Sequence, residues 1–358
     1  MLNHAWDDDF ADSRNRGIDA AECDWIVCVD ADERLINASA LRDQITRASK
    51  EIGGFIIERH DLVQDRETGR SMVHAVGIVR AFRKQDTIRY AGAVHERVGE
   101  SVLAAGFHLE IASGCRIDHL VRAMSPLALK RKQQGYLKLL NREISRDPSD
   151  PWFRYYRAKT HWYLAHEDEA LIDFKEVETS DRTDGFLRAS AFSMRALLLS
   201  ELERPDEAMA AVAQSLHLVS RQSLAHYTAA EVLYRRGRFA DAADEYRKVR
   251  LTLGDESNVD AWHGDYYFSA EKRAYKIGCC YLALGQLDDA SRVFGDGVMI
   301  NPADAGCYFG MAHVTLNQGR LEDAVGYVSE SIVCDPGWQE PRRLKEKIMA
   351  AIECSFAK

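Results

Sequence analysis

An acidic residue followed directly by an alanine recurs in the second half of this 358-residue chain. The alanines are spaced 38, 34, 48 and 34 residues apart, and they are Ala170, Ala208, Ala242, Ala290 and Ala324. A period near 34 residues accommodates two helices and their turns, and such units bury their apolar faces only by stacking on one another. The chain beyond about residue 125 is therefore predicted to be an all-helical array.

Two other positions repeat in step with these alanines. Twelve residues earlier stands a small residue that lets the two helices of a unit approach closely: Ala158, Ala196, Ala230, Gly278 and Ala312. Four residues later stands a residue expected to fill the core between units: Phe174, Val212, Tyr246, Phe294 and Val328. Glycine turns precede the last three alanines, and Asn301-Pro302 and Asp335-Pro336 are predicted to end the last two units.

This pattern resembles the tetratricopeptide repeats, which bind proteins or peptides on their concave face or dock on a neighbouring domain, and which perform no chemistry themselves. The resemblance implies about five repeats within residues 125–358 and a capping helix over Trp338–Ile352. The 48-residue interval contains an insertion of roughly 14 residues, about 251–264, which must project as a loop or lengthen a helix. Aromatic residues of the first repeat, such as Trp152 and Tyr156, are expected in the core or on the array surface.

Residues 1–124 have a different character, because short β-type runs are broken by turns. The predicted strands are Trp25–Val29, Phe55–Glu58, Val76–Phe82, Ile88–Ala91 and Ala112–Ile117. A helix capped by Ser39 is expected between the first two strands, since Leu41, Ile45 and Ala48 have helical spacing. The change of period places a domain boundary at the turn Ser125-Pro126.

The first predicted strand ends at Asp30 and Asp32. Side chains alternate along a strand, so these carboxylates are expected to point the same way. If the strand is central, they lie where open α/β sheets bind ligands. Oxygen ligands there suit Mg²⁺ or Mn²⁺. A phosphatase-type nucleophile pair, or a surface turn without an ion, remains open on this motif alone. An EF-hand is excluded because Arg34 and Leu35 occupy positions that need an oxygen ligand and glycine.

Several motifs accompany this pair in a fixed order. They are Trp6-Asp-Asp-Asp-Phe10, Ser13-Arg-Asn15, Val79-Arg-Ala-Phe-Arg83, Tyr90-Ala-Gly-Ala-Val-His-Glu96 and Ile117-Asp-His119. Together with the Asp-x-Asp-Glu strand they resemble the family 2 glycosyltransferases, in particular bacterial members followed by tetratricopeptide repeats. The resemblance implies an α/β domain with a partial GT-A-like mixed sheet and helices, followed by an all-α solenoid. It implies an inverting hexose transfer from a nucleotide-sugar, a UDP-sugar foremost, to a peptide, protein or glycan.

The resemblance also implies roles for individual residues. Asp30, Asp32 and His119 would hold Mn²⁺ or Mg²⁺, and Arg14, Asn15 and Asp30 would meet the nucleotide donor. Glu96 would act as the general base, oriented by His95. Structural roles stay open for several of them: capping and salt bridging for Arg14 and Asn15, and burial for His95 and His119. Arg80 and Arg83 either face substrate or form a solvated pair.

The match begins late, because members of this family carry about two βα units, roughly 60 residues, ahead of the segment that corresponds to Trp6–Asn15. We therefore expect an incomplete nucleotide pocket and an exposed sheet edge, which leaves a homodimer open. The alternative function is a tetratricopeptide interaction scaffold with a vestigial, inactive transferase domain.

The composition argues against several further classes of protein. A net charge of −9 argues against a nucleic-acid binder, which needs a basic face. The chain has no apolar run long enough for a membrane span and no basic-then-apolar leader, so a cytoplasmic protein is expected. None of the eight cysteines forms a Cys-x-x-Cys pair, which argues against a zinc site.

Overall fold

The computed structural model describes residues 5–64, 71–121, 124–250 and 269–356. A mixed sheet lies in the first part of the chain, as expected. Its strands are β1 (Trp25–Val27), β2 (Glu33–Ile36), β3 (Ile52–Gln64), β4 (Ser71–Arg83), β5 (His108–Ile111) and β6 (Arg116–Val121). The order is β1-β4-β3-β6-β2, with β5 pairing β3 outside this path. Strand β3 is antiparallel to β4 and parallel to β5 and β6.

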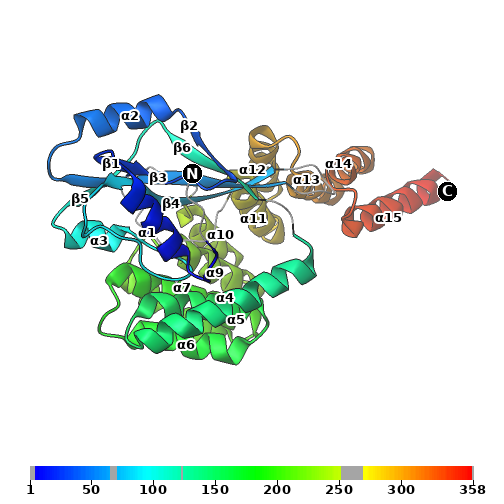
Figure 1. Cartoon of the computed structure of the whole chain (residues 1–358). Coiled ribbons are helices and arrows are strands. Elements are labelled where there is room, and N and C mark those ends of the chain that lie inside the picture. Colours follow the sequence, from blue (N-terminus) through cyan, green and yellow to red (C-terminus); the bar gives the residue numbers. More distant parts are fainter. Residues whose placement is uncertain (1–4, 65–70, 122–123, 251–268, 357–358) are drawn as a thin grey trace.

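Three helices cover the sheet, α1 (Phe10–Ala20), α2 (Ala38–Arg47) and α3 (Gly99–Ala104). Figure 1 shows α2 on one side of the sheet and α1 and α3 on the other. Two apolar clusters match these layers. One joins Ile18 of α1 to Phe82 and Val102, and the other joins Leu41 of α2 to Phe55 and Ile117. The alternation of side chains along the strands supplies both layers.

Several strand predictions need correction. Strand β1 ends at Val27 and lies at the end of the strand order, so it is not central. Residues 88–91 form only the isolated bridge of Ala91 to Arg97. Residues 112–115 belong to the loop before β6. The N-cap of α2 is Asn37, in the left-handed conformation, and Ser39 lies inside the helix and donates to Asn37.

Antiparallel helices make up the rest of the chain. After α4 (Pro126–Arg146), consecutive helices pack in pairs. The pairs are α5 (Pro151–Tyr163) with α6 (Glu167–Thr179), α7 (Gly185–Glu201) with α8 (Pro205–Leu218), α9 (Ser223–Arg235) with α10 (Phe239–Lys248), α11 (Ala270–Ala283) with α12 (Leu287–Ile300), and α13 (Ala305–Asn317) with α14 (Leu321–Cys334). Helix α15 (Gln339–Phe356) packs on α14 at the C-terminal end of the array (Figure 1).

The repeated positions are buried as predicted. All five alanines that define the period are 0% exposed, and the large residues four positions later are also buried. A Cβ on Gly278 would lie 2.5 Å from the ring of Phe294, which explains the need for a small residue there. Helices α12 and α14 end at Ile300 and Cys334, immediately before the predicted Asn-Pro and Asp-Pro stops. The predicted insertion, 251–264, lies outside the described residues.

The array begins against the sheet domain. Ser125 caps α4 by accepting from the backbone of Ala128. Leu140 and Ile144 of α4, with Phe153 of α5, then pack on Val94, which belongs to the loop that follows β4. The indole of Trp152 donates to the backbone carbonyl of His95 over 3.0 Å. The loop that holds His95 and Glu96 is therefore fixed by the first helices of the array.

Candidate functional site

The predicted carboxylate pair lies in the turn between β1 and β2. The two side chains do not point the same way, because strand alternation ends with β1 at Val27. Asp30 faces helix α1 and strand β4, whereas Asp32 faces β6. The backbone of the turn is held at both ends, since Glu33 donates to the carbonyl of Asp30 and Leu120 donates to that of Asp32.

Asp30 is paired with two arginines. The Nη2 atoms of Arg14 and Arg80 lie 2.9 and 2.8 Å from its Oδ2 atom. Burial alone would raise the pKa of Asp30, but hydrogen bonding and charge from these guanidinium groups lower it to about 2. Arg80 is 6% exposed, so the expectation of a solvated Arg80–Arg83 pair is wrong for this residue. Arg83 instead donates to the backbone of Ile52 and Ser49.

Asp32 lies beside the predicted histidine. The Nε2 atom of His119 is 3.5 Å from Oδ2 of Asp32, and its Nδ1 atom is 2.7 Å from Oδ1 of Asp61. The hydrogen bond with Asp61 is the main cause of a raised pKa for His119. The Asp32 side chain is 59% exposed, so the carboxylate can reach a ligand from solvent.

The predicted base, Glu96, is joined to Asp30 through Arg14. The guanidinium of Arg14 lies between Glu96 and Asp30, with Nε 2.7 Å from Oε1 of Glu96. His95 does not orient Glu96 by any hydrogen bond found among the described residues. Its ring stacks on Tyr156 at 3.9 Å and meets Tyr136 edge-on. Burial, with charge from Lys159 and Lys132, lowers the pKa of His95 to about 3.

Asn15 serves the fold. Its amide donates to the carbonyl of Tyr90 and accepts from the backbone N–H of Tyr90, each over 2.9 Å. These bonds attach α1 to the loop that leads to Glu96. Of the two roles considered for Asn15, the geometry favours the structural one.

Three charged residues beside Asp30 and His119 were not predicted as site residues: Glu33, Arg59 and Asp61. Glu33, whose side chain is 1% exposed, accepts from Nη2 of Arg80 at 2.9 Å and from the backbone of Asp30. Arg59 pairs with Asp61 at 2.9 Å. Both Arg59 and Asp61 stand in the run Glu-Arg-His-Asp on β3, a density of charge unusual inside a strand. That run of charged residues was the sequence signal by which Arg59 and Asp61 could have been identified.

The structure brings together two of the three predicted metal ligands. Within the described ranges, no group of three or more His, Cys, Asp or Glu side chains is close enough to hold a metal ion. Asp32 and His119 remain as a pair. Ligand bonds of roughly 2.1 Å at right angles put two ligand atoms about 3 Å apart, so the 3.5 Å separation suits two ligands of one cation.

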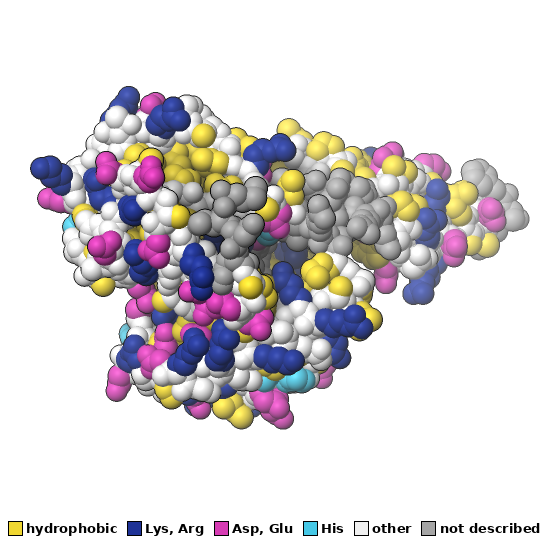
Figure 2. All heavy atoms as spheres, in the orientation of Figure 1, with side chains coloured by type: hydrophobic (Ala, Val, Ile, Leu, Met, Phe, Trp, Pro, Cys, Tyr) yellow, Lys and Arg dark blue, Asp and Glu magenta, His cyan; other side chains and the backbone are white. Residues whose placement is uncertain are grey.

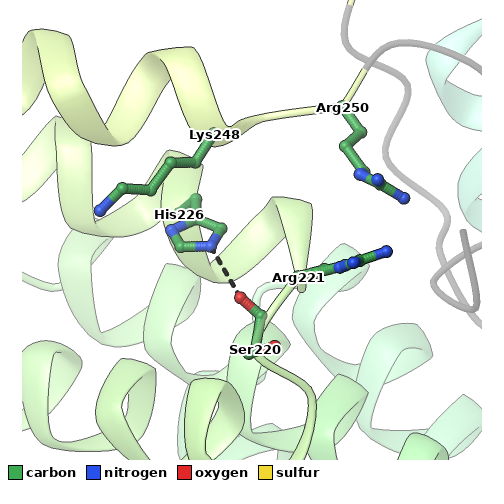
Figure 3. Close-up of a pocket in the computed structure, with 5 residues that line it drawn as sticks. All are labelled: Ser220, Arg221, His226, Lys248 and Arg250. Atoms are coloured by element: carbon green, nitrogen blue, oxygen red, sulfur yellow. Dashed lines mark hydrogen bonds between the residues drawn. The ribbon is translucent and has the colours of Figure 1, made fainter. Parts of the chain in front are cut away.

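A second feature is a basic pocket in the array. It is lined by Ser220, Arg221, His226, Lys248 and Arg250, with a volume near 420 Å³. Figure 3 shows the guanidinium groups of Arg221 and Arg250 projecting to the same side of the pocket, while His226 is bonded to the carbonyl of Ser220. Glu245 pairs with His226 and Lys248 at 2.6 Å each. Arg221 has no ion pair within the described part of the chain.

The face of the molecule drawn in Figure 2 is of mixed charge. Figure 2 shows acidic and basic side chains interspersed over the first helices of the array. Exposed charges of this part of the chain also form pairs, as in Arg182 with Asp147 at 2.9 Å. None of the described helices is long and apolar enough to cross a membrane.

The helical part is thus a TPR-like solenoid of stacked helix pairs. The tetratricopeptide repeat family matches residues 193–256. A TPR repeat-containing protein of Synechococcus elongatus is 37% identical over 106 residues, which cover 29% of this chain. The matched segment is 24% of that relative, so the chain spans about a quarter of its length.

Solved structures with a similar helical arrangement share little sequence. The Cut9–Hcn1 hetero-tetramer of the APC/C matches with a TM-score of 0.47 and 14% identity, over 62% of this chain and 40% of that one. YrrB, described as a TPR protein with an unusual peptide-binding site, matches with a TM-score of 0.44 and 16% identity, over 59% and 99%. Yeast Tom70 matches with a TM-score of 0.43 and 15% identity, over 66% and 44%.

Proposed function

We propose that the repeat array binds a protein or peptide partner and holds it beside the α/β domain. The observation that carries this proposal is the regular stacking of helix pairs, whose repeated alanines are all 0% exposed. Such stacking leaves extended surfaces of α5 to α14 for recognition. The array is joined to the α/β domain through α4 and α5, so a bound partner stays close to that domain.

The basic pocket indicates the chemistry of the partner. Arg221, Lys248 and Arg250 line it, and Glu245 is already shared by His226 and Lys248. A carboxylate or phosphate would gain charge-assisted hydrogen bonds from guanidinium groups there. The chain as a whole carries −9 and repels an acidic partner, so affinity for one must arise from a local basic site.

Fluorescence anisotropy with labelled octapeptides tests this function. We expect the full chain to bind octaglutamate more tightly than an octapeptide of glycine and serine, and to bind less tightly as salt rises. Octalysine is the control for general attraction to the acidic chain. Equal affinities for octaglutamate and the neutral peptide would contradict the proposed partner chemistry.

A second candidate function is metal-dependent glycosyl transfer, with a nucleotide-sugar donor and a peptide, protein or glycan acceptor. The specific observation that favours it is the 3.5 Å approach of Asp32 to His119. These two residues would hold Mn²⁺ or Mg²⁺, with the remaining positions open to water and diphosphate oxygens. Such an ion would neutralise charge on the departing nucleotide diphosphate.

The remaining residues have defined parts in this candidate function. Glu96 would take the proton of the acceptor hydroxyl while the hydroxyl oxygen bonds to the sugar carbon and the bond to the diphosphate breaks. Arg14, bonded to Glu96 at 2.7 Å, would hold this carboxylate in place. Asp30, paired with Arg14 and Arg80, fixes the turn that carries Asp32.

Release of UDP from UDP-sugars in the presence of Mn²⁺ tests the second candidate. We expect release that is abolished by Asp32→Asn and by His119→Gln, and kept by Asp43→Asn, which removes an exposed carboxylate of α2. Absence of UDP release from a panel of UDP-sugars with either Mn²⁺ or Mg²⁺ would leave the scaffold function alone.

A further inference from the structure

We propose that Asp61 is a positioning residue that orients His119 for binding a divalent cation together with Asp32. This inference rests on the second candidate function. Asp61 lies on a different strand from His119 and would act on the cation only through the histidine ring. The two aspartates that face His119 therefore have separate tasks.

The sheet register brings Asp61 to His119. The two residues are Cα partners across the parallel pair of β3 and β6. Their side chains meet with Nδ1 of His119 2.7 Å from Oδ1 of Asp61. A carboxylate accepts and does not donate, so this contact places a ring proton on Nδ1. The other ring nitrogen, Nε2, faces Oδ2 of Asp32 across 3.5 Å, and its lone pair is open to a cation when the ring is neutral.

Asp61 itself is poorly placed to be a ligand. Its carboxylate also pairs with Arg59, with Nε 2.9 Å from Oδ1 and Nη2 3.2 Å from Oδ2. Its side chain is 16% exposed, against 59% for Asp32. The open carboxylate is therefore that of Asp32, and the enclosed one is that of Asp61. Histidines that bind metals usually donate their other ring N–H to such an enclosed carboxylate.

A plain structural ion pair would explain the same contact, but it predicts different behaviour. A pair that only stabilises the sheet leaves metal affinity unchanged in any variant that folds. An orienting carboxylate changes both the tautomer of His119 and the affinity. Loss of such a partner typically weakens metal binding about 10–100-fold.

The test measures free Mn²⁺ by electron paramagnetic resonance while the metal alone is titrated into the full chain. We expect one site in the unaltered protein and binding about 10–100-fold weaker in Asp61→Ala. Asp118→Asn is the matched control, since Asp118 neighbours His119 on β6 but pairs with Arg116. It should bind Mn²⁺ as the unaltered protein does. Asp61→Asn, of nearly the same shape, replaces the alanine variant if that one fails to fold.

Nitrogen-15 NMR of the metal-free protein gives a second readout. At a pH where the His119 ring is neutral, we expect it to carry its proton on Nδ1 in the unaltered chain and to shift towards the Nε2 tautomer in Asp61→Ala. If the protein binds Mn²⁺ and both Asp61 variants bind it within twofold of the unaltered chain, the role of Asp61 is overturned while the cation site stands. If the unaltered protein binds no Mn²⁺, the cation site fails and the role of Asp61 fails with it.

Discussion

Arg14 and Glu96 form an ion pair with Nε 2.7 Å from Oε1, although 82 residues separate them in the sequence. Both side chains are largely enclosed, at 16% and 15% exposure. The same guanidinium reaches Asp30. Helix α1 thereby ties the β1–β2 turn to the loop that packs on the array.

Replacing Arg14 by alanine should destabilise the fold. The change leaves Glu96 without its partner and removes one of the two arginines at Asp30. Removing one partner of a buried ion pair costs about 3–5 kcal/mol of folding free energy. Because Asp30 is partly exposed, we expect a loss of about 2 kcal/mol. Urea unfolding followed by circular dichroism measures the loss.

Arg16→Ala is the control on the same helix. Arg16 pairs with Asp12 four residues away, and both side chains are about half exposed. We expect a change below about 0.5 kcal/mol. Equal losses for the two variants would show that the Arg14 contacts add nothing specific.

His95 should make stability depend on pH. Its pKa in the folded chain is about 3, below the ordinary 6.5, because the packed ring is held neutral. Between these values the unfolded chain binds a proton that the folded chain excludes, so stability falls as pH drops from 6.5 towards 3. Asparagine tolerates the left-handed backbone at this position, where φ is +52°. The His95→Asn variant should therefore fold. It should be less stable at pH 8 because the packed ring is lost, and it should lose less stability on acidification.

The measurement is the free energy of unfolding at pH 8 and at pH 5 for both proteins. His108→Gln, an exposed histidine of β5, should retain the full pH dependence. A pH profile of His95→Asn that parallels that of the unaltered protein would show that the ring is not held neutral.

Glycine in the inter-helix turns of the first two repeats should stabilise the folded protein. Ala165 and Glu203 adopt a left-handed backbone with φ of +57° each, at the position where the last three repeats carry glycine. Removing this strain should stabilise the Glu203→Gly variant by about 0.5–1 kcal/mol, after the entropy gained by its unfolded chain. Gly237→Ala, the opposite change at φ +73°, should lose a similar amount. Thermal unfolding of the two variants gives the sign directly.

Arg97 should couple the sheet domain to the array. It pairs with Asp150 at 2.6 Å and lies over the rings of Trp152 and Phe153. Arg97→Ala should cost about 2–3 kcal/mol and separate one calorimetric transition into two, since fewer contacts then join the parts. Arg204→Ala, which breaks a surface pair within the array, should leave a single transition. An unsplit peak in Arg97→Ala would contradict the coupling.

The repeat array was predictable because its core positions recur. The positions of Ala158, Ala170 and Phe174 in the first repeat recur in each of the five copies, so the same packing demand appears five times in the sequence. Strands were less predictable. The run from residue 112 to 117 has β character, yet residues 112–115 lie in a loop because pairing with β2 and β3 begins further along.

Part of the candidate site could be predicted because its residues stand in local sequence motifs. The local motifs singled out Asp32 with His119 and Arg14 with Glu96, and the fold places the members of each pair side by side. They did not identify Asp61, since its link to His119 is a register between β3 and β6 and leaves no local pattern. The predicted direction of the Asp30 side chain was wrong because this side chain pairs with arginines on α1 and β4.

The claim that the array binds an acidic partner through its basic pocket is tested most directly by charge reversal. We predict that Arg221→Glu weakens the binding of labelled octaglutamate about tenfold, because a repelling charge replaces an attracting one at the pocket. Arg292→Glu, the same change on exposed α12, should bind octaglutamate as the unaltered chain does. Equal affinities of the two variants for the peptide would contradict the account.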